Sequence, residues 1–295
     1  MRVVEFDLHK FKKMEKLLLD NRITSTECQM YFLPVKEKWE NKVKLFKNFY
    51  IDSGEYFSNK LFTIHELVDS REELQVENVV FPDELVAIDG KVCGYMMPYI
   101  ESENLSLVLQ DSAVESNFKI NLLKQVGDIL KKVATTDKYV KPFLLGDVNE
   151  NNFVVDDTGT VYAVDLDSCK IGNNLPFPSR YIHVIGKKSD TLAGKYIKNE
   201  EGIYIPTQNT ELSCFNIMVM NTIANGRVDR LCINEFYYYL EYLKTLDYDF
   251  EIIDCFASIY SSADTKDPSE ILEFIPEMTG QATLKVYKYL RDKNR

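Results

Sequence analysis

The stretch from Leu145 to Lys170 constrains the fold of this chain more than any other part of the sequence. It reads LGDVNENNFVVDDTGTVYAVDLDSCK. Two short apolar runs, 153–155 and 161–164, lie on either side of the turn sequence DDTG at 156–159. Apolar runs separated by such turn residues are typical of two antiparallel strands. The sequence therefore predicts a β-hairpin at this point.

Three polar residues are arranged around this hairpin. Asp147 lies five residues before Asn152, and Asp165 follows Asn152 by thirteen residues. Folding the hairpin would return Asp165 to the neighbourhood of Asn152, so that a carboxylate and an amide oxygen can share a hard cation. Phosphoryl transfer uses such a set: one Asp orients and deprotonates the attacking hydroxyl, while an Asn and a second Asp hold the metal ions.

The composition narrows the classes of function. The 295-residue chain has a net charge of −11 and a pI near 4.9, which argues against a general binder of nucleic acid or anionic membranes. It shows no signal-peptide pattern and no apolar run near the ~20 residues of a membrane span. Its six cysteines form no C-x-x-C pair and its three histidines no cluster. We therefore expect a cytoplasmic protein with reduced thiols.

Hydrophobic periodicity predicts an α+β chain. The first hundred residues alternate between the two kinds of element, and a two-residue Asp89-Gly90 loop predicts a hairpin. The predicted elements are a helix at 7–20, strands at 28–33 and 42–46, a helix at 53–68, and strands at 85–88 and 92–97. After residue 105 the pattern is mostly helical, with helices predicted at 118–135, 211–224 and 235–247.

The motif and the order of the elements resemble the protein-kinase-like superfamily. The resemblance implies a bilobal fold, with a small β-rich N-lobe at 1–100 containing one main helix, preceded by the helix at 7–20, and a larger helical C-lobe at 101–295. It implies that Asp147 is the catalytic Asp and that Asn152 and Asp165 are metal ligands. Asp167 would support the first metal ion or bind a second.

The most specific resemblance is to a group of bacterial atypical serine/threonine kinases. Those proteins carry a "Gly-Tyr-Leu-Met-Pro" hinge and a "Val-Asp-Val-Asp-Ser-Phe-Gln" metal motif. This chain has GYMMP at 94–98 and VDLDSCK at 164–170, together with KLF at 44–46 and FP at 81–82. The similarity covers roughly residues 22–225 and is specific only at the hinge and the metal motif.

The same resemblance implies a nucleotide site. Lys44 is similar to the strand lysine that holds the α- and β-phosphates, although Lys42 and Lys47 compete for this role. Its partner on the following helix would be Glu55 or Glu66, which are eleven residues apart and share one helical face.

The hinge would bind adenine through residues near Met97. Pro98 has no N–H, but the hinge residue at this position uses only its carbonyl. Ile100 would then supply the N–H donor.

Four features depart from the kinase pattern. The segment corresponding to the phosphate loop, Ile23 to Met30, contains no glycine, although close backbone approach to phosphates favours glycine. Leu145-Gly146 replaces the usual His-Arg before the catalytic Asp, and Asn149 stands where serine/threonine kinases often have Lys. DLD at 165–167 replaces Asp-Phe-Gly, and the added carboxylate is similar to that of small-molecule kinases.

These observations favour a phosphotransferase that depends on ATP and Mg²⁺, with Mn²⁺ as an alternative ion, and that acts on a hydroxyl group of a protein. The polar span 168–210 contains candidate acceptors and basic residues, which favours a protein substrate or a regulatory protein partner. A pseudokinase that serves as a binding module is the alternative. A small-molecule kinase is the third hypothesis.

Overall fold

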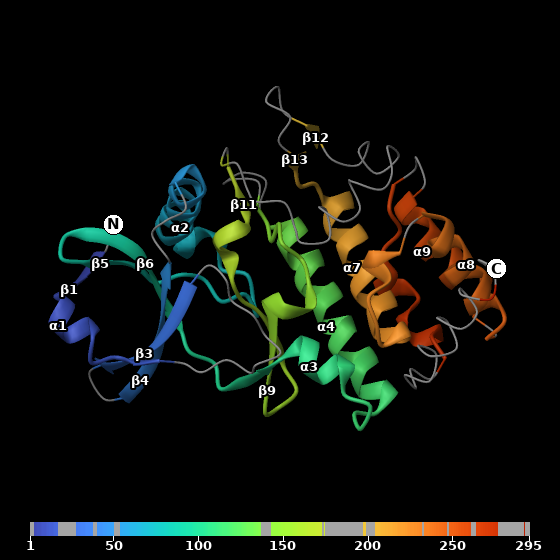
Figure 1. Ribbon diagram of the computed structural model, residues 1–295, viewed down its shortest axis with the longest axis horizontal. Helices are drawn as coiled ribbons and strands as arrows, with labels where there is room; N and C mark the ends of the chain where they lie inside the picture. The colour runs from blue at the N-terminus through green and yellow to red at the C-terminus, as the bar shows by residue number, and fades with distance from the viewer. Residues whose placement is uncertain are drawn as a thin grey trace.

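The computed structural model describes residues 3–16, 28–37, 40–49, 54–136, 143–172, 174, 197–198, 204–231, 233–246, 248–260, 264–276 and 292. The protein is mixed α+β: a sheet built from the first hundred residues is followed by a part that is mainly helical (Figure 1). This agrees with the fold class predicted from periodicity. Within the described residues, no helix is both long and apolar enough to cross a membrane.

Six strands form the N-terminal sheet. They are β1 (Val3–Phe6), β2 (Glu15–Lys16), β3 (Cys28–Glu37), β4 (Glu40–Phe49), β5 (Glu84–Ile88) and β6 (Lys91–Pro98). Their order across the sheet is β1-β5-β6-β4-β3-β2, and all neighbours are antiparallel except β1 and β5. The predicted turn between β5 and β6 is confirmed, because Asp89 and Gly90 have φ values of 48° and 78°. Positive φ at both central residues is what a tight two-residue hairpin turn requires.

The two faces of this sheet have different coverings. Helix α2 (Gly54–Leu74) packs on one face, where Ile64 and Leu67 join the main hydrophobic core that continues into the helical part. The short helix α1 (Leu8–Phe11) lies on the other face, and Phe11 packs there against Tyr31 and Phe46. Successive side chains of a strand point to opposite faces, so alternate residues of β4 belong to different cores.

The prediction of one helix over 7–20 is wrong. Helix α1 ends at Phe11, and the chain turns through Met14 into strand β2, which pairs with β3. Phe11 and Met14 both pack on the outer face of the sheet, so their apolar spacing reflects a turn laid on a sheet. Tertiary packing overrides the helical periodicity here.

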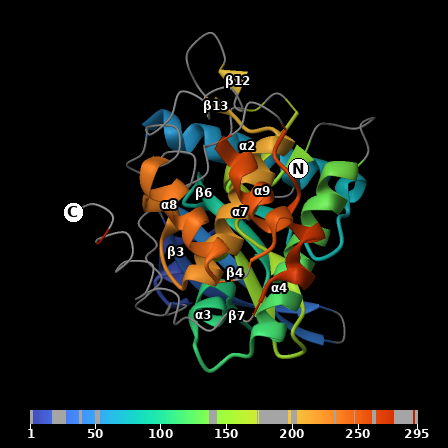
Figure 2. The same cartoon turned by 90° about the vertical axis from the view of Figure 1, so that its right-hand side faces the viewer.

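Helices form most of the C-terminal part. They are α3 (Leu105–Gln110), α4 (Ser116–Thr135), α7 (Gln208–Ala224), α8 (Ile233–Lys244) and α9 (Phe250–Ala257), with short 3-10 helices η2 (Glu150–Asn152), η3 (Leu166–Ser168), η4 (Val228–Arg230), η5 (Ser258–Tyr260), η6 (Pro268–Glu270) and η7 (Leu272–Phe274). Figure 2 shows α7 between α4, α8 and α9. Helix α7 is buried from Thr210 to Ala224 except Leu212, which confirms the prediction of an enclosed helix.

The predicted hairpin is also present. It consists of β9 (Phe153–Asp156) and β10 (Val161–Ala163), and β7 (Ser102–Asn104) pairs with β9 as a third strand. Two further pairs join β8 (Phe143–Leu144) to β11 (Lys170–Ile171) and β12 (Ile197–Lys198) to β13 (Tyr204–Ile205).

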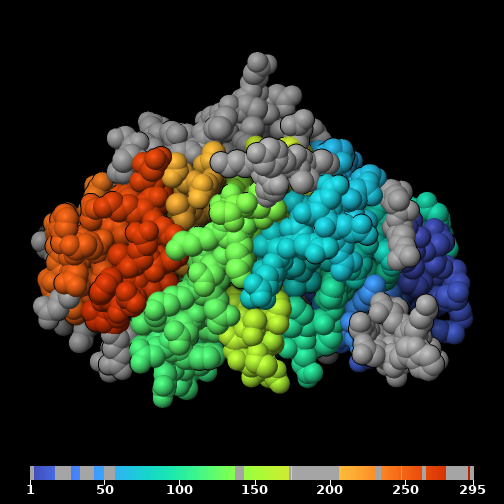
Figure 3. Space-filling model, turned by 180° about the vertical axis from the view of Figure 1, so that it is seen from behind, coloured from blue at the N-terminus to red at the C-terminus, as the bar shows by residue number. Residues whose placement is uncertain are grey.

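The hairpin contacts the segment that connects α2 to β5. The Val80 amide donates to the Ala163 carbonyl at 2.9 Å. Lys132 of α4 binds Glu77 of the same connection at 2.5 Å. On the face drawn in Figure 3, the residues of α2 and α4 accordingly lie next to each other.

Candidate active site

Lys47 lies on the face of β4 that packs on the main core, which continues into the helical part. Leu45 and Phe49, two residues away on each side, belong to the main core, and Lys47 is only 2% exposed. Lys44 lies three residues earlier, at a position of β4 whose side chain points to the opposite face of the sheet. Its ammonium group binds Asp83 at 3.1 Å.

The structure therefore distinguishes the surroundings of two of the candidate strand lysines. The position beside Asp165 belongs to Lys47, not to Lys44, because the pleat of β4 directs these two side chains to different surroundings. The sequence contained a signal for this: Lys47 has apolar residues two positions before and after it, whereas Lys44 has Lys42 and Phe46. A lysine flanked in this way shares a buried face. The side chain of Lys42 is outside the described residues.

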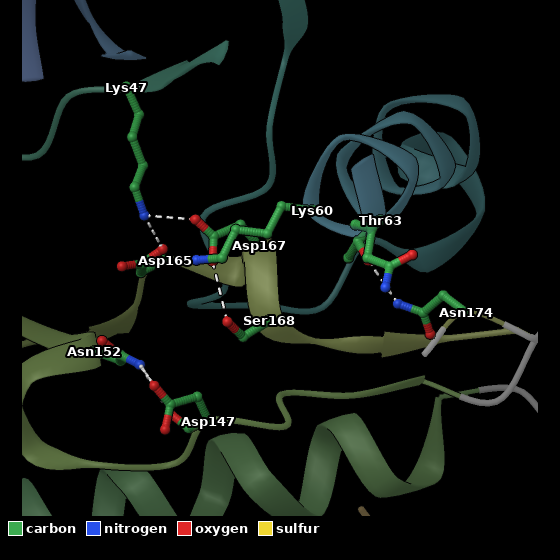
Figure 4. Close-up of polar contacts among 10 residues, drawn as sticks. Lys47, Lys60, Thr63, Asp147, Asn152, Asp165, Asp167, Ser168 and Asn174 are labelled. Atoms are coloured by element: carbon green, nitrogen blue, oxygen red, sulfur yellow. Dashed lines mark hydrogen bonds and ion pairs between the residues drawn. The ribbon is translucent and has the colours of Figure 1, made fainter. Parts of the chain in front are cut away.

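Two aspartates from the segment after β10 bind the Lys47 ammonium. Asp165 accepts through Oδ1, and Asp167, at the centre of η3, accepts through Oδ2 at 2.7 Å (Figure 4). Asp165 has a left-handed backbone conformation, with φ 62° and ψ 57°, which is uncommon for a residue other than glycine. This conformation separates the end of β10 from η3, and both carboxylates reach the same lysine.

Lys60 of α2 is a second cation in this cluster. Its Nζ lies 2.9 Å from Asp167 Oδ1, and the Ser168 hydroxyl lies 3.1 Å from the same oxygen. Lys60 is 4% exposed and Asp167 is 3% exposed. We call Lys47, Lys60, Asp165 and Asp167 the lysine–aspartate cluster.

The electrostatics of the cluster follow from burial and opposite charge. Burial alone would raise the pKa of Asp167, but Lys47 and Lys60 outweigh it and hold that pKa well below its usual range. Burial would likewise lower the pKa of Lys47, yet Asp165 and Asp167 raise it well above the ordinary value. Burial, followed by the negative charge of Asp167, raises the pKa of Asp165. Lys47 and Asp167 are therefore a stable ion pair, and Asp165 is the carboxylate that gains most from an added cation.

Asp147 and Asn152 form the second half of the site. The Asn152 side-chain amide donates to the backbone carbonyl of Asp147 at 2.8 Å and to its Oδ2 at 3.0 Å. The Asn152 carbonyl accepts from the Val164 amide at 2.9 Å. Asn152 is thus linked both to Asp147 and to the residue that precedes Asp165, as expected from the predicted hairpin.

Gly146 allows the loop before Asp147 to approach the segment around Ser168. Its φ is 76°, and a Cβ at this position would lie 2.4 Å from the Ser168 carbonyl oxygen. Because of the positive φ and the close carbonyl oxygen, a larger residue could occupy this position only with strain. The glycine therefore brings the loop of Asp147 against the chain that carries Asp167.

Glu211 supports the same loop from helix α7. Its Oε1 accepts from the Gly146 amide at 3.0 Å. Burial raises the pKa of this carboxyl to about 7, although the backbone amides of Gly146 and Leu145 oppose the shift. Glu211 was not predicted from the sequence, where its only signal was an acidic residue at the start of a helix that is otherwise apolar.

The predicted hinge residues lie at the end of β6. Met97 is buried and pairs with Leu45, while Pro98 pairs with Lys44. Tyr99 donates its amide to the Val43 carbonyl at 3.3 Å, and Ile100 is partly buried beyond the strand. Because Lys47 lies on the adjacent strand, the hinge and the cluster border one region of the molecule.

The remaining predictions concern the partner of the strand lysine and the phosphate loop. Glu66 is half-buried on α2, and the described ion pairs of Lys44 and Lys47 do not include it. The side chain of Glu55 and residues 23–27 lie outside the described part of the chain. So does most of the predicted acceptor span 168–210. Among the described side chains of α2, Lys60 reaches the cluster, and it was not predicted from the sequence.

The metal predictions have mixed geometric support. In the described ranges, no group of three or more His, Cys, Asp or Glu residues is arranged to hold an ion. Both oxygens of Asp167 bind lysines, and a carboxylate paired in this way is unsuited to act as a metal ligand. By contrast, Asn152 Oδ1 and Asp165 Oδ2 have no protein partner among the described residues.

No protein-family model and no curated protein matches this chain. Its function is therefore inferred from the geometry of the site.

Proposed function

We propose that the chain is a phosphotransferase that depends on ATP and Mg²⁺, and most specifically an atypical serine/threonine protein kinase. The observation that carries this proposal is the buried Lys47 bound to Asp165 beside the Asn152–Asp147 pair. The element order supports it: β4 with its lysine, then α2, then β5 and β6, corresponds to the small lobe of a kinase. In such enzymes a strand lysine, a metal Asp, a metal Asn and a catalytic Asp act together.

Each residue has a defined task in this proposal. Lys47 binds the α- and β-phosphates, and Met97, Pro98 and Ile100 border the adenine. Asp147 orients the acceptor hydroxyl and takes its proton as the hydroxyl oxygen bonds to the γ-phosphorus, while the bond from that phosphorus to the β–γ bridging oxygen breaks and ADP leaves.

The donor set fits Mg²⁺, because Asn152 Oδ1 and Asp165 Oδ2 are hard oxygen atoms without a partner in the described protein. The bound ion would neutralise charge on the phosphates. Asn152 directs its amide nitrogen to Asp147, so the same side chain would couple the metal side of the site to the catalytic loop.

The proposal is tested by measuring ATP binding with and without Mg²⁺, using calorimetry and thermal shift. The wild type is expected to bind and gain about 3 kcal/mol of stability at an ATP concentration near 100 times the dissociation constant. Asp165→Ala should lose this gain. Asp147→Asn should bind ATP but lose autophosphorylation or ATP hydrolysis.

The proposal would be ruled out if the wild-type protein did not bind ATP at millimolar concentration with either Mg²⁺ or Mn²⁺. Asp147→Asn that transfers phosphate at the wild-type rate would remove Asp147 from the mechanism.

A pseudokinase is the second candidate, and the lysine–aspartate cluster favours it. Two lysines already neutralise Asp165 and Asp167 within the protein, and the segment at 23–30 has no glycine. ATP binding without any transfer, in wild type and Asp147→Asn alike, would support this candidate and contradict the enzyme.

A further inference from the structure

Helix α2 contributes a cation to the cluster where the kinase pattern has a carboxylate. In protein kinases the strand lysine pairs with a glutamate of the helix that follows. Among the described residues, Lys47 instead forms ion pairs with Asp165 and Asp167. Among the described side chains of α2, Lys60 reaches this group, with its Nζ 2.9 Å from Asp167 Oδ1.

Asp167 lies between the two ammonium groups. One oxygen binds Lys47 at 2.7 Å and the other binds Lys60, and the side chains of all three residues are at most 4% exposed. A buried carboxylate with a cation on each oxygen is fully paired, whereas removal of one partner leaves buried charge without compensation. Asp167 is therefore committed to the two lysines.

A second contact joins α2 to the same segment. The side-chain amide of Asn174 donates to the Thr63 hydroxyl at 2.7 Å (Figure 4). It also donates to the Cys169 carbonyl at 2.8 Å. Thr63 lies one helical turn after Lys60 on the buried face of α2. The position of α2 is thus defined by two polar links to residues 167–174.

We propose that Lys60 is a positioning residue that holds Lys47 and α2 in place through Asp167, and that Asp167 is the carboxylate partner of Lys47 and not a metal ligand. This inference rests on the proposed phosphotransferase function. It reverses the charges of the familiar pair: the carboxylate comes from the segment after β10, and the helix supplies the cation.

The reversal also changes the charge of the site. Two lysines and two aspartates sum to zero, whereas one lysine, one helix glutamate and one metal Asp would sum to about −1. A site that is more positive by one charge attracts a polyphosphate more strongly. Lys60 would in this way offset part of what a glycine-free phosphate loop lacks.

The test compares Lys60→Met with Lys119→Met, because both lysines are 4% exposed and Lys119 lies on α4, outside the cluster. ATP affinity of Lys60→Met should fall about tenfold or more, as expected when one partner of a buried charge pair is removed. Amide hydrogen exchange without nucleotide should rise across 57–70 and 165–171. Lys119→Met should change neither quantity.

A transposed variant, Lys60→Glu combined with Asp167→Gly, restores the familiar arrangement with a helix carboxylate facing Lys47. It should recover ATP affinity to within about threefold of the wild type, a coupling that independent sites do not show. A merely structural lysine would not be rescued by a glutamate. If Lys60→Met does not fold, the ATP affinity of the transposed variant alone tests the proposal: recovery supports it, and no recovery contradicts it.

Two outcomes would overturn the inference: unchanged ATP affinity in Lys60→Met, or unchanged exchange of α2. Failure of the proposed function is a separate result, since wild-type protein would then bind no ATP. In that case hydrogen exchange still tests whether Lys60 positions α2. Faster hydrogen exchange of α2 in Lys60→Met, with a return to the wild-type rate in the transposed variant, supports the positioning of α2 by Lys60. Unchanged exchange in Lys60→Met contradicts it.

Discussion

Two clusters in the described part of the chain each place one aspartate between two cations. In the lysine–aspartate cluster, Asp167 binds Lys47 at 2.7 Å and Lys60 at 2.9 Å. In the second, which we call the Asp83 cluster, Asp83 binds Lys44 at 3.1 Å and also Arg71. Both clusters draw one cation from β4 and one from α2.

The two clusters differ in contact with water. The side chains of Lys47 and Lys60 are 3% and 4% exposed, whereas those of Lys44 and Arg71 are 17% and 44% exposed. Water can replace a lost partner in the Asp83 cluster but not in the lysine–aspartate cluster. Solvation, more than residue type, therefore separates the two clusters.

The largest expected effect is the loss of Asp167. Asp167→Ala should lower the free energy of unfolding by about 3 kcal/mol or more, since two buried ammonium groups lose a partner. Asp83→Ala should lower it by about 1 kcal/mol, because its cations reach solvent. Urea denaturation at neutral pH measures both. Equal losses for the two variants would contradict the comparison.

Glu211 extends the comparison to a buried carboxylate that binds backbone amides in place of cations. Burial raises its pKa from 4.5 to about 7, so the protonated form is favoured in the folded protein. The stabilisation of the folded protein by protonated Glu211 is complete below pH 4.5 and is lost as the pH rises through about 7. The free energy of unfolding should fall by about 3 kcal/mol between these limits, because each tenfold change in the protonation equilibrium corresponds to roughly 1.4 kcal/mol.

Glu211→Gln should remove this slope, because glutamine does not titrate. Urea denaturation from pH 5 to pH 8 measures the difference between the variant and the wild type. Glu103→Gln, at an exposed position of β7, is the matched control and should keep the wild-type slope. A Glu211→Gln profile parallel to the wild type would show that Glu211 is ionised throughout.

The smallest effect is expected for Lys44. Lys44→Met should change the free energy of unfolding by about 0.5 kcal/mol, as for partly exposed ion pairs, and should leave ATP affinity unchanged. Lys47→Met, on the same strand, should abolish ATP binding. Calorimetry on the two variants makes the comparison, and loss of binding in Lys44→Met with retention in Lys47→Met would restore the original assignment.

Much of the fold was predictable from local patterns. The hairpin of β9 and β10, the turn at Asp89-Gly90 and the buried helix α7 each depend on residues that are close in sequence. The helix over 7–20 failed for the opposite reason, since Phe11 and Met14 pack on a sheet formed by distant residues. Spacing alone could not separate these two cases.

The candidate site was predictable in part. Asp147, Asn152 and Asp165 were found because a hairpin of known length connects them. Lys47 was one of three candidates, and strand alternation with Leu45 and Phe49 would have favoured it. Lys60 and Glu211 had no sequence signal of this kind, since their partners lie 107 and 65 residues away.

The local arrangement of residues 145–170 was determined by the sequence itself, because backbone geometry over short distances leaves few arrangements for two strands and a turn. The ion pairs of Lys47 and Lys60 were decided by the packing of β4 and α2 against that segment. Burial excludes water from Lys47, Lys60 and Asp167, and the strength of their ion pairs depends on that exclusion. Exclusion of water is a property of the assembled core, which no local run of residues contains.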